Sequence, residues 1–241
     1  MSQPYTKRTI MKHQIYSETL DSKRDYWVYL PPGYSELVSY PVIYCQDGLE
    51  FLNYGRIATQ MNYLILEEDL QPAIIVGVHV DLPNRNEEYA PNGSRYKQYA
   101  HFFTEQLLPE VERQYPIRRT PKERIIAGDS LGATVSLQLA LDRSDLFGKV
   151  LSLSGAYRNP SKEQIVLHAD LSHLQIYMLI GKQETEVQTK WGTENFLQLN
   201  RETLPLLETR GAEVAYYEQD GTHVWGFWQQ YIPQALHYLL S

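Results

Sequence analysis

The stretch Arg124–Ala133 constrains the fold more than any other part of this chain. It reads RIIAGDSLGA, an apolar run that ends in a Gly-Asp-Ser-Leu-Gly pentapeptide with Ser130 at its centre. The apolar run is typical of a buried strand, and the apolar residues after the pentapeptide recur with the spacing of a helix. Where a strand turns sharply into a helix the two backbones nearly touch, so small residues are required two positions before and two after the bend. Gly128 and Gly132 meet that requirement.

Strands and helices alternate through most of the 241 residues, of which 43% are hydrophobic. This alternation predicts an α/β fold with a mostly parallel, doubly wound sheet and helices on both faces. The length suits a single domain over residues 1–241 that buries about 70–75% of the surface of its unfolded chain. No stretch between Ser154 and Leu174 is long enough for a large lid domain, so we expect an open site.

The hydrophobic period and the turn residues place the individual elements. The strands are expected at 8–19, 24–30, 42–46, 73–80, 125–127, 147–154, 176–180 and 213–218, the first two as an antiparallel pair. Helices are expected at 55–68, 94–115, 194–209 and 226–240 and directly after Ser130. Residues 47–48 are expected to form a turn and residues 81–93 a polar loop.

A serine at such a bend is either a nucleophile or part of a plain turn, and only partner residues elsewhere in the chain can distinguish these. A serine hydroxyl needs an imidazole to accept its proton, and on this type of sheet the chain order is Ser, then Asp or Glu, then His. Of the histidines after Ser130, His223 alone lies in a loop directly after a predicted strand. His237 falls in a predicted helix, and His79 comes too early in the chain. We therefore predict His223 as the base.

The acid is expected in the loop after the preceding main strand, where Glu184 and Glu186 follow Gly181. Glu184 is closer to the strand end and is the predicted acid. Glu186 remains an alternative, and so does a Ser130–His223 dyad without a working acid. Two backbone amides must also stabilise the oxyanion of the attacked carbonyl group. The amide of Leu131 follows the nucleophile, and the turn after the strand at 42–46 presents that of Leu49.

Composition excludes several classes of partner. The chain has 22 basic and 29 acidic residues, a net charge of −7 and no basic block, which argues against nucleic acid or an anionic membrane surface as partner. No His, Cys and carboxylate cluster has the spacing of a metal site, and no glycine-rich phosphate loop is present, so we expect no metal and no cofactor. The single Cys45 lies in an apolar run, as a buried structural thiol would. The N-terminal residues lack a signal-peptide core, so we expect a cytoplasmic protein; the oligomeric state is left open.

Taken together, these motifs resemble the putative-esterase branch of the α/β-hydrolases, which contains esterase D and the enterobactin (enterochelin) esterase-like trilactone hydrolases. The matching segments are Arg24–Tyr34, Tyr40–Gly48, Arg85–Pro91, Leu107–Glu112, the bend at Ser130, Leu146–Gly148, Leu153–Gly155 and Gly221–Trp225. The resemblance implies the α/β-hydrolase fold, with Ser130 as nucleophile, His223 as base and the amides of Leu131 and Leu49 as oxyanion donors. Two positions depart from the family pattern: Ala133 replaces a second glycine, and the acid is Glu where many relatives have Asp.

The expected reaction is hydrolysis of a small-molecule carboxylic ester through an acyl-enzyme. Among the substrates of the family, a cytoplasmic siderophore ester, a catecholate trilactone, fits a chain without a signal peptide better than exported feruloyl or acetyl polysaccharide esters do. Such a substrate is aromatic and anionic, and we expect Arg85 and Trp225 to contact it. A general carboxylesterase, a feruloyl or acetyl esterase, an acyltransferase and a non-catalytic hydrolase-like binding protein are the alternatives.

Overall fold

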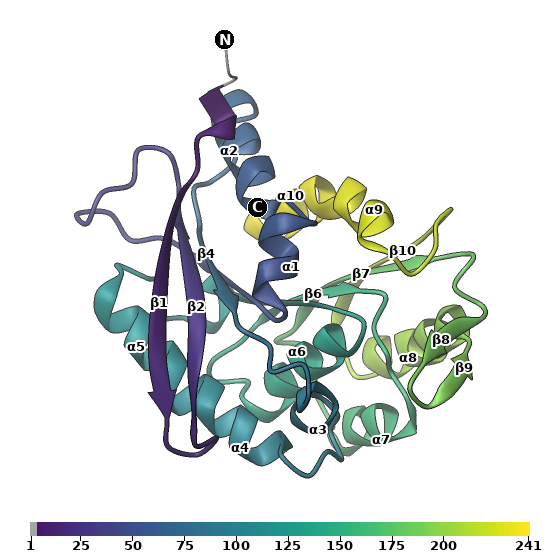
Figure 1. Ribbon diagram of the computed structural model, residues 1–241. Coiled ribbons are helices and arrows are strands. Elements are labelled where there is room, and N and C mark those ends of the chain that lie inside the picture. The colour runs from purple at the N-terminus through teal and green to yellow at the C-terminus, as the bar shows by residue number, and fades with distance from the viewer. Residues whose placement is uncertain (1–3) are drawn as a thin grey trace.

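The continuous apolar runs of the sequence become the buried central strands of one eight-stranded sheet in the computed structural model, which describes residues 4–241 (Figure 1). The strand order is β1-β2-β4-β3-β5-β6-β7-β10. The strands are β1 (Thr9–Ser17), β2 (Ser22–Leu30), β3 (Val42–Cys45), β4 (Ile74–Val78), β5 (Arg124–Asp129), β6 (Lys149–Leu153), β7 (Gln175–Gly181) and β10 (Glu213–Gln219). Strand β2 runs antiparallel to β1 and to β4, and the other neighbours are parallel. The predicted mostly parallel, doubly wound sheet is confirmed.

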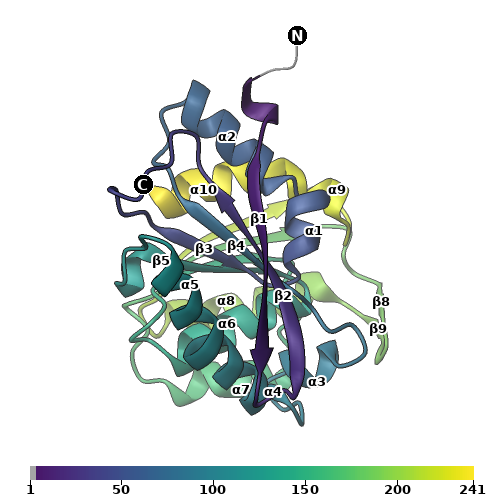
Figure 2. The same cartoon turned by 60° about the vertical axis from the view of Figure 1, so that its left-hand side comes forward.

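Helices cover both faces of this sheet, and each face has its own hydrophobic core (Figure 2). One layer contains α1 (Gly48–Asn53), α2 (Ile57–Glu67), α9 (Trp225–Trp228), the 3₁₀ turn η4 (Gln229–Tyr231) and α10 (Ile232–Leu240). The other contains α3 (Arg85–Tyr89), α4 (Tyr96–His101), α5 (Leu108–Gln114), α6 (Leu131–Asp142), α7 (Asn159–Leu167) and α8 (Phe196–Glu208). Short 3₁₀ turns lie at η1 (Pro4–Thr6) and η3 (Pro121–Glu123).

The helix predicted for 94–115 is present but not uniform. It consists of α4, a π-helical segment η2 (Phe102–Leu107) and α5, in direct succession. Pro109 lies in the first turn of α5 and has no backbone N–H to donate, so the regular hydrogen-bond ladder cannot continue unchanged through this point.

Several short elements were not predicted. The polar loop expected at 81–93 contains the five-residue helix α3, and the turn expected at 47–48 leads straight into α1. Helix α7 and the hairpin of β8 (Val187–Thr189) and β9 (Gly192–Glu194) were missed as well. These segments are too short to show a period, and their structure depends on contacts with the rest of the protein.

The bend at Ser130 has the close packing that its glycines predict. A Cβ atom on Gly128 would lie 2.1 Å from the backbone of Gly132, a distance that no side chain tolerates. Ser130 itself has φ 53° and ψ −121°, which is rare for a residue with a side chain. Strand β5 and helix α6 are thus joined by a sharp bend that holds the serine at the carboxyl edge of the sheet.

Candidate active site

Parallel strands bring residues that are distant in sequence to one edge of the sheet. The turn before Leu49 follows β3, Ser130 follows β5, Glu184 follows β7 and His223 follows β10. Because β3, β5, β6, β7 and β10 are consecutive neighbours with parallel pairing, their carboxyl ends lie along the same edge. This is the edge at which open α/β sheets bind their ligands.

Three residues at these strand ends have left-handed or otherwise positive φ angles although they are not glycine. They are Asp47 after β3, Ser130 after β5 and Ser154 after β6, with φ of 51°, 53° and 48°. Each such residue costs on the order of 1–3 kcal/mol, and such strain persists only where the surrounding packing enforces it. Its concentration on three adjacent strand ends marks this edge as the candidate site.

Glu184 forms a direct hydrogen bond with His223. The carboxylate Oε2 lies 2.6 Å from His223 Nδ1, and the Glu184 side chain is fully buried. Its Oε1 accepts from the Ser154 hydroxyl at 2.6 Å and from the Gly181 amide at 2.9 Å. Glu186, the alternative acid, is exposed. Of the two glutamates in the loop, the structure brings Glu184 to the histidine.

Two aromatic rings and a serine hold this pair in place, a role that sequence reasoning assigned to none of them. The His223 ring packs edge-on against Phe196 and Trp228, with centroid distances of 4.5 and 4.9 Å. Trp228 Nε1 donates to Ser154 Oγ at 2.7 Å, and that hydroxyl in turn donates to Glu184. A chain of hydrogen bonds therefore runs from α9 through the end of β6 to the imidazole. Ser154 lies in the matching segment Leu153–Gly155, but no spacing in the sequence connects it or Trp228 with Glu184.

Ser130 and His223 line the same cavity, which has a volume of about 250 Å³. Among residues 4–241 no hydrogen bond joins the Ser130 hydroxyl to the His223 ring. Such bonds are often long before substrate is bound and shorten in the complex. The other residues of the lining are Arg85, Asn86, Leu131, Ala156, Arg158, Val187, Gln188, Thr189, Lys190, Trp191 and Phe196.

Two helix N-termini meet beside Ser130. Leu131 is the first residue of α6 and Leu49 the second residue of α1, so the N–H group of each lacks an acceptor within its own helix. The two turns are in contact: a Cβ atom on Gly132 would lie 2.8 Å from Asp47 Oδ2. Leu131 lines the cavity, whereas Leu49 is 38% exposed and is not part of the lining. Both helix termini favour a developing negative charge in this region.

Arg85 lines the cavity and is fixed from behind by Asp47. Its Nη2 lies 2.7 Å from Asp47 Oδ2 and its Nε 3.0 Å from Oδ1, a bidentate pair. Burial alone disfavours the charge on Arg85, but the Asp47 carboxylate outweighs it and raises the pKa of the guanidinium. Glu88 pairs with Arg24 and Arg95 instead, and Glu87 accepts from Ser94. The helix α3 thereby ties the cavity wall to the turn that precedes Leu49.

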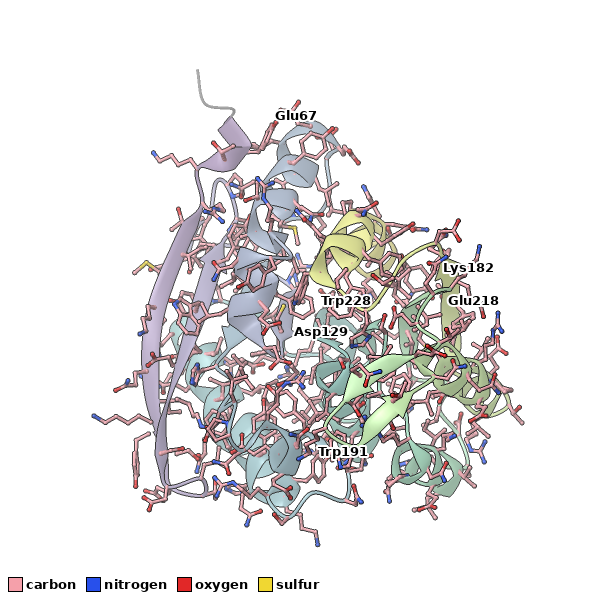
Figure 3. The ribbon with its side chains drawn as sticks, turned by 45° about the vertical axis from the view of Figure 1, so that its right-hand side comes forward. Glu67, Asp129, Lys182, Trp191, Glu218 and Trp228 are labelled. Atoms are coloured by element: carbon pink, nitrogen blue, oxygen red, sulfur yellow. The ribbon has the colours of Figure 1, made fainter. Side chains whose placement is uncertain are left out.

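Trp225, for which a contact with substrate is predicted, is not among the residues that line this cavity. Its ring packs edge-on against Phe51 and Trp228, and its Nε1 donates to Glu50 Oε2 at 2.8 Å. The indole thus connects α9 with α1. The tryptophan on the cavity is Trp191 of the β8–β9 hairpin, which follows no predicted strand and which sequence reasoning did not single out. In Figure 3, Trp228 and Asp129 lie near the middle of the molecule and Trp191 lies at the hairpin.

The other singled-out residues lie outside the cavity lining. His237 forms a hydrogen bond with Glu68 at 2.8 Å, and His79 contacts the Trp27 ring. Cys45 is fully buried, and burial raises the pKa of its thiol. Across residues 4–241, no group of three or more His, Cys, Asp or Glu side chains is arranged to hold a metal ion. None of the helices in that range is long and apolar enough to cross a membrane.

The sheet order, the strained serine after β5 and the buried Glu–His pair define a protein of the α/β-hydrolase class. Residues 17–239 match the family described as "Putative esterase", and the chain belongs to that family. The chain is 36% identical over 234 residues to the uncharacterized protein YjcH of Bacillus subtilis, covering 96% of this chain and 98% of that protein. The family membership makes this protein an esterase.

Solved structures of esterases share the fold. A ferulic acid esterase aligns with a TM-score of 0.80 at 20% identity, covering 97% of this chain and 98% of its own. An enterobactin esterase from Shigella flexneri, crystallised in the presence of enterobactin, aligns with a TM-score of 0.82 at 21% identity and covers 96% of this chain. The present chain corresponds to 59% of that longer protein. At these identities the likeness establishes the α/β-hydrolase fold.

Asp129, directly before the serine, is a buried acid with an unusual environment. It is 5% exposed, and its Oδ1 has no hydrogen-bond partner within the described part of the chain. Burial, reinforced by the nearby Asp47 charge, raises the pKa of the Asp129 carboxyl well above its ordinary value, although Arg85 acts in the opposite direction. In the folded protein this carboxyl therefore retains its proton to a higher pH than in the unfolded chain.

The raised pKa of the Asp129 carboxyl leads to a prediction for Asp129→Asn. The unfolded carboxyl titrates near pH 3.9, so above about pH 4 and below the raised pKa the folded state binds the extra proton. The contribution of this group to the free energy of unfolding is thus present at low pH. It is lost as pH rises, by up to about 1.4 kcal/mol per pH unit. Urea unfolding from about pH 5 to pH 9 is expected to show the variant gaining stability over the wild type with rising pH.

The matched control is Asp220→Asn, because the Asp220 side chain is 83% exposed. Its stability difference from the wild type is expected to stay constant over the same range. A difference between Asp129→Asn and the wild type that does not change with pH would contradict the proposed environment of Asp129.

Proposed function

We propose that this protein is a serine esterase that hydrolyses a carboxylic ester through an acyl-enzyme on Ser130. The observation that carries the proposal is the buried Glu184 carboxylate, 2.6 Å from His223 Nδ1, at the cavity that Ser130 also lines. A histidine held in this way has its Nε2 available as a base. The strained position of Ser130 exposes its hydroxyl at the same cavity.

In the first half of the reaction, Ser130 Oγ forms a bond to the ester carbonyl carbon while its proton passes to His223 Nε2. The carbonyl oxygen becomes an oxyanion, which the amides of Leu131 and Leu49 would stabilise, each by about 3–4 kcal/mol. When the tetrahedral intermediate collapses, the carbon–oxygen bond to the alcohol breaks. His223 returns the proton to the departing alkoxide oxygen, leaving the acyl group on Ser130.

In the second half, a water molecule attacks the acyl carbon and gives its proton to His223. Collapse breaks the bond to Ser130 Oγ, which regains the proton from His223, and the carboxylic acid is released. Glu184 accepts a hydrogen bond from the Nδ1–H group throughout, so it fixes the tautomer and stabilises the imidazolium that forms in each half. Ser154 and Trp228 act as positioning residues because they hold Glu184 and the His223 ring.

Replacement of the nucleophile is the first test. Ser130→Ala is expected to lower kcat for p-nitrophenyl acetate by roughly 10⁴- to 10⁶-fold, since no other group can form the acyl-enzyme. Mass spectrometry of the wild type quenched during turnover is expected to show the acyl group on the peptide that contains Ser130. Ser39→Ala, an exposed serine before the opposite end of β3, serves as control and should retain wild-type activity. Equal turnover by Ser130→Ala would contradict the proposal and favour a non-catalytic binding protein.

Replacement of the acid distinguishes a triad from a dyad. Glu184→Gln keeps the size of the side chain but loses the charge that stabilises the His223 imidazolium, so kcat/KM should fall about 10³- to 10⁴-fold. Glu186→Gln, the neighbouring exposed glutamate, is expected to stay within about 2-fold of the wild type. A loss of less than about 10-fold in Glu184→Gln would show that Ser130 and His223 work as a dyad.

For the substrate, the charges around the cavity favour an anionic, aromatic ester. Arg85, Arg158 and Lys190 all line it, the first two already paired with Asp47 and Glu194, although the chain as a whole has a net charge of −7. Trp191 and Phe196 supply aromatic surface. We include in the proposal that a catecholate trilactone siderophore, which combines rings with negative charge, is hydrolysed at this cavity. A cytoplasmic location stays a prediction from the sequence.

A substrate panel tests the siderophore assignment. Ferric and iron-free catecholate trilactones are expected to be hydrolysed with kcat/KM of about 10⁴ M⁻¹s⁻¹ or more. This value is expected to exceed the kcat/KM for p-nitrophenyl acetate, because the cations of the cavity attract the anionic trilactones. Liquid chromatography of the products gives the rate of ring opening, and raised salt should reduce it. Cleavage of short p-nitrophenyl esters together with intact trilactones would instead identify a general carboxylesterase.

A further inference from the structure

A second cavity adjoins the first and differs from it in character. Its volume is about 230 Å³, and it shares Leu131, Ala156, Arg158 and Trp191 with the cavity of Ser130. Its remaining lining consists of small or weakly polar side chains, namely Ala90, Pro91, Asn92, Thr134, Pro160 and Ser161. Among residues 4–241, Arg158 is the one charged residue that lines this second cavity. The second cavity therefore suits an uncharged group.

Trp191 lies at the boundary between the two cavities. Although it is 50% exposed, its ring is held by two cations: the Arg158 guanidinium lies 4.2 Å and the Lys190 ammonium 4.6 Å from its centroid. Arg158 also pairs with Glu194 on the adjacent strand of the hairpin, Nε to Oε1 at 2.7 Å. The Trp191 amide donates to the Thr189 hydroxyl at 3.1 Å. These contacts hold the indole in one place at the solvent-exposed rim.

The position of His223 indicates which part of an ester enters which cavity. His223 must return a proton to the departing alcohol, so the alcohol has to leave on the side of its ring. The second cavity is lined by Leu131 but not by His223 or Ser130. It begins at the proposed oxyanion donor and extends along α6 to Thr134, one turn further on. The group on the other side of the carbonyl carbon, the acyl group, would therefore enter it.

We propose that the second cavity is the acyl pocket and that Trp191 is the specificity-determining residue that limits its size. This inference rests on the proposed function of Ser130 and names the part of the acyl group that enters the pocket: a single uncharged ring of benzoyl type, as in an iron-free catechol whose hydroxyls keep their protons, or a short branched chain. A dry cavity of about 150 Å³ is known to hold benzene, so a volume of 230 Å³ accommodates one substituted ring. The charged first cavity receives the alcohol portion.

The test uses one variant that fills the pocket and one that opens it. Ala90→Leu adds three carbons to the lining and is expected to lower kcat/KM for p-nitrophenyl benzoate by about 10-fold while p-nitrophenyl acetate changes less than about 2-fold. Trp191→Ala removes the boundary and is expected to raise the ratio of kcat/KM for the 2-naphthoate ester to that for the benzoate ester by about 10-fold. Trp27→Ala is the matched control, because Trp27 also contacts a cation, Lys12, but lies on β2, away from both cavities.

Binding gives a readout that does not depend on turnover. In a Ser130→Ala background, calorimetric titration with methyl benzoate is expected to show binding about 10-fold weaker when Ala90→Leu is added. Adding Trp27→Ala instead is expected to leave the affinity for methyl benzoate unchanged. Acyl preferences and methyl benzoate affinity that are the same in all variants would overturn the acyl pocket. If the wild type hydrolyses no ester but Ala90→Leu still weakens methyl benzoate binding, the pocket is supported and the proposed function fails.

Discussion

The contact between Gly128 and Gly132 is the constraint on which the site depends. It allows helix α6 to start within one residue of the end of β5, and Ser130 is held at the bend in a conformation that side chains rarely adopt. That strain costs on the order of 1–3 kcal/mol, and burial of α6 offsets it: residues 131–141 of this helix are buried between the sheet and its neighbours. A serine at the end of a loosely packed loop would relax out of this position.

Around that bend, buried charges are arranged in two separate groups. On one side the Glu184 carboxylate accepts hydrogen bonds from Ser154, Gly181 and His223. These bonds stabilise its negative charge in the buried site and hold it beside the imidazole. On the other side Asp47 is paired with Arg85, while burial and the nearby Asp47 charge raise the pKa of the neighbouring Asp129 carboxyl. The first group positions the base, and the second fixes the turn that leads to Leu49.

The bend, the strand ends and His223 could be predicted because each leaves a local sequence pattern. Buried parallel strands appear as continuous apolar runs, and the chain order of serine, acid and histidine limits the choice to a few residues. Glu184 was favoured over Glu186 only by its distance from the strand end, and the structure places it against His223. The roles of Trp228, Ser154 and Arg158 could not be assigned, because these residues reach the site through tertiary contacts that no spacing encodes. For the same reason Trp225, two residues after His223, was predicted to contact substrate, whereas Trp191 adjoins the cavity only through folding of the hairpin.

The account requires that Ser130, His223 and two main-chain amides converge on one carbonyl group. A crystal structure of the protein after reaction with an alkyl p-nitrophenyl phosphonate, which mimics the tetrahedral intermediate, tests this most directly. We expect a bond from phosphorus to Ser130 Oγ, with the phosphoryl oxygen about 2.7–3.1 Å from the amide nitrogens of Leu131 and Leu49 and His223 Nε2 within hydrogen-bond reach of the adduct. Phosphonate attached to another residue, or a phosphoryl oxygen directed away from both amides, would contradict the account.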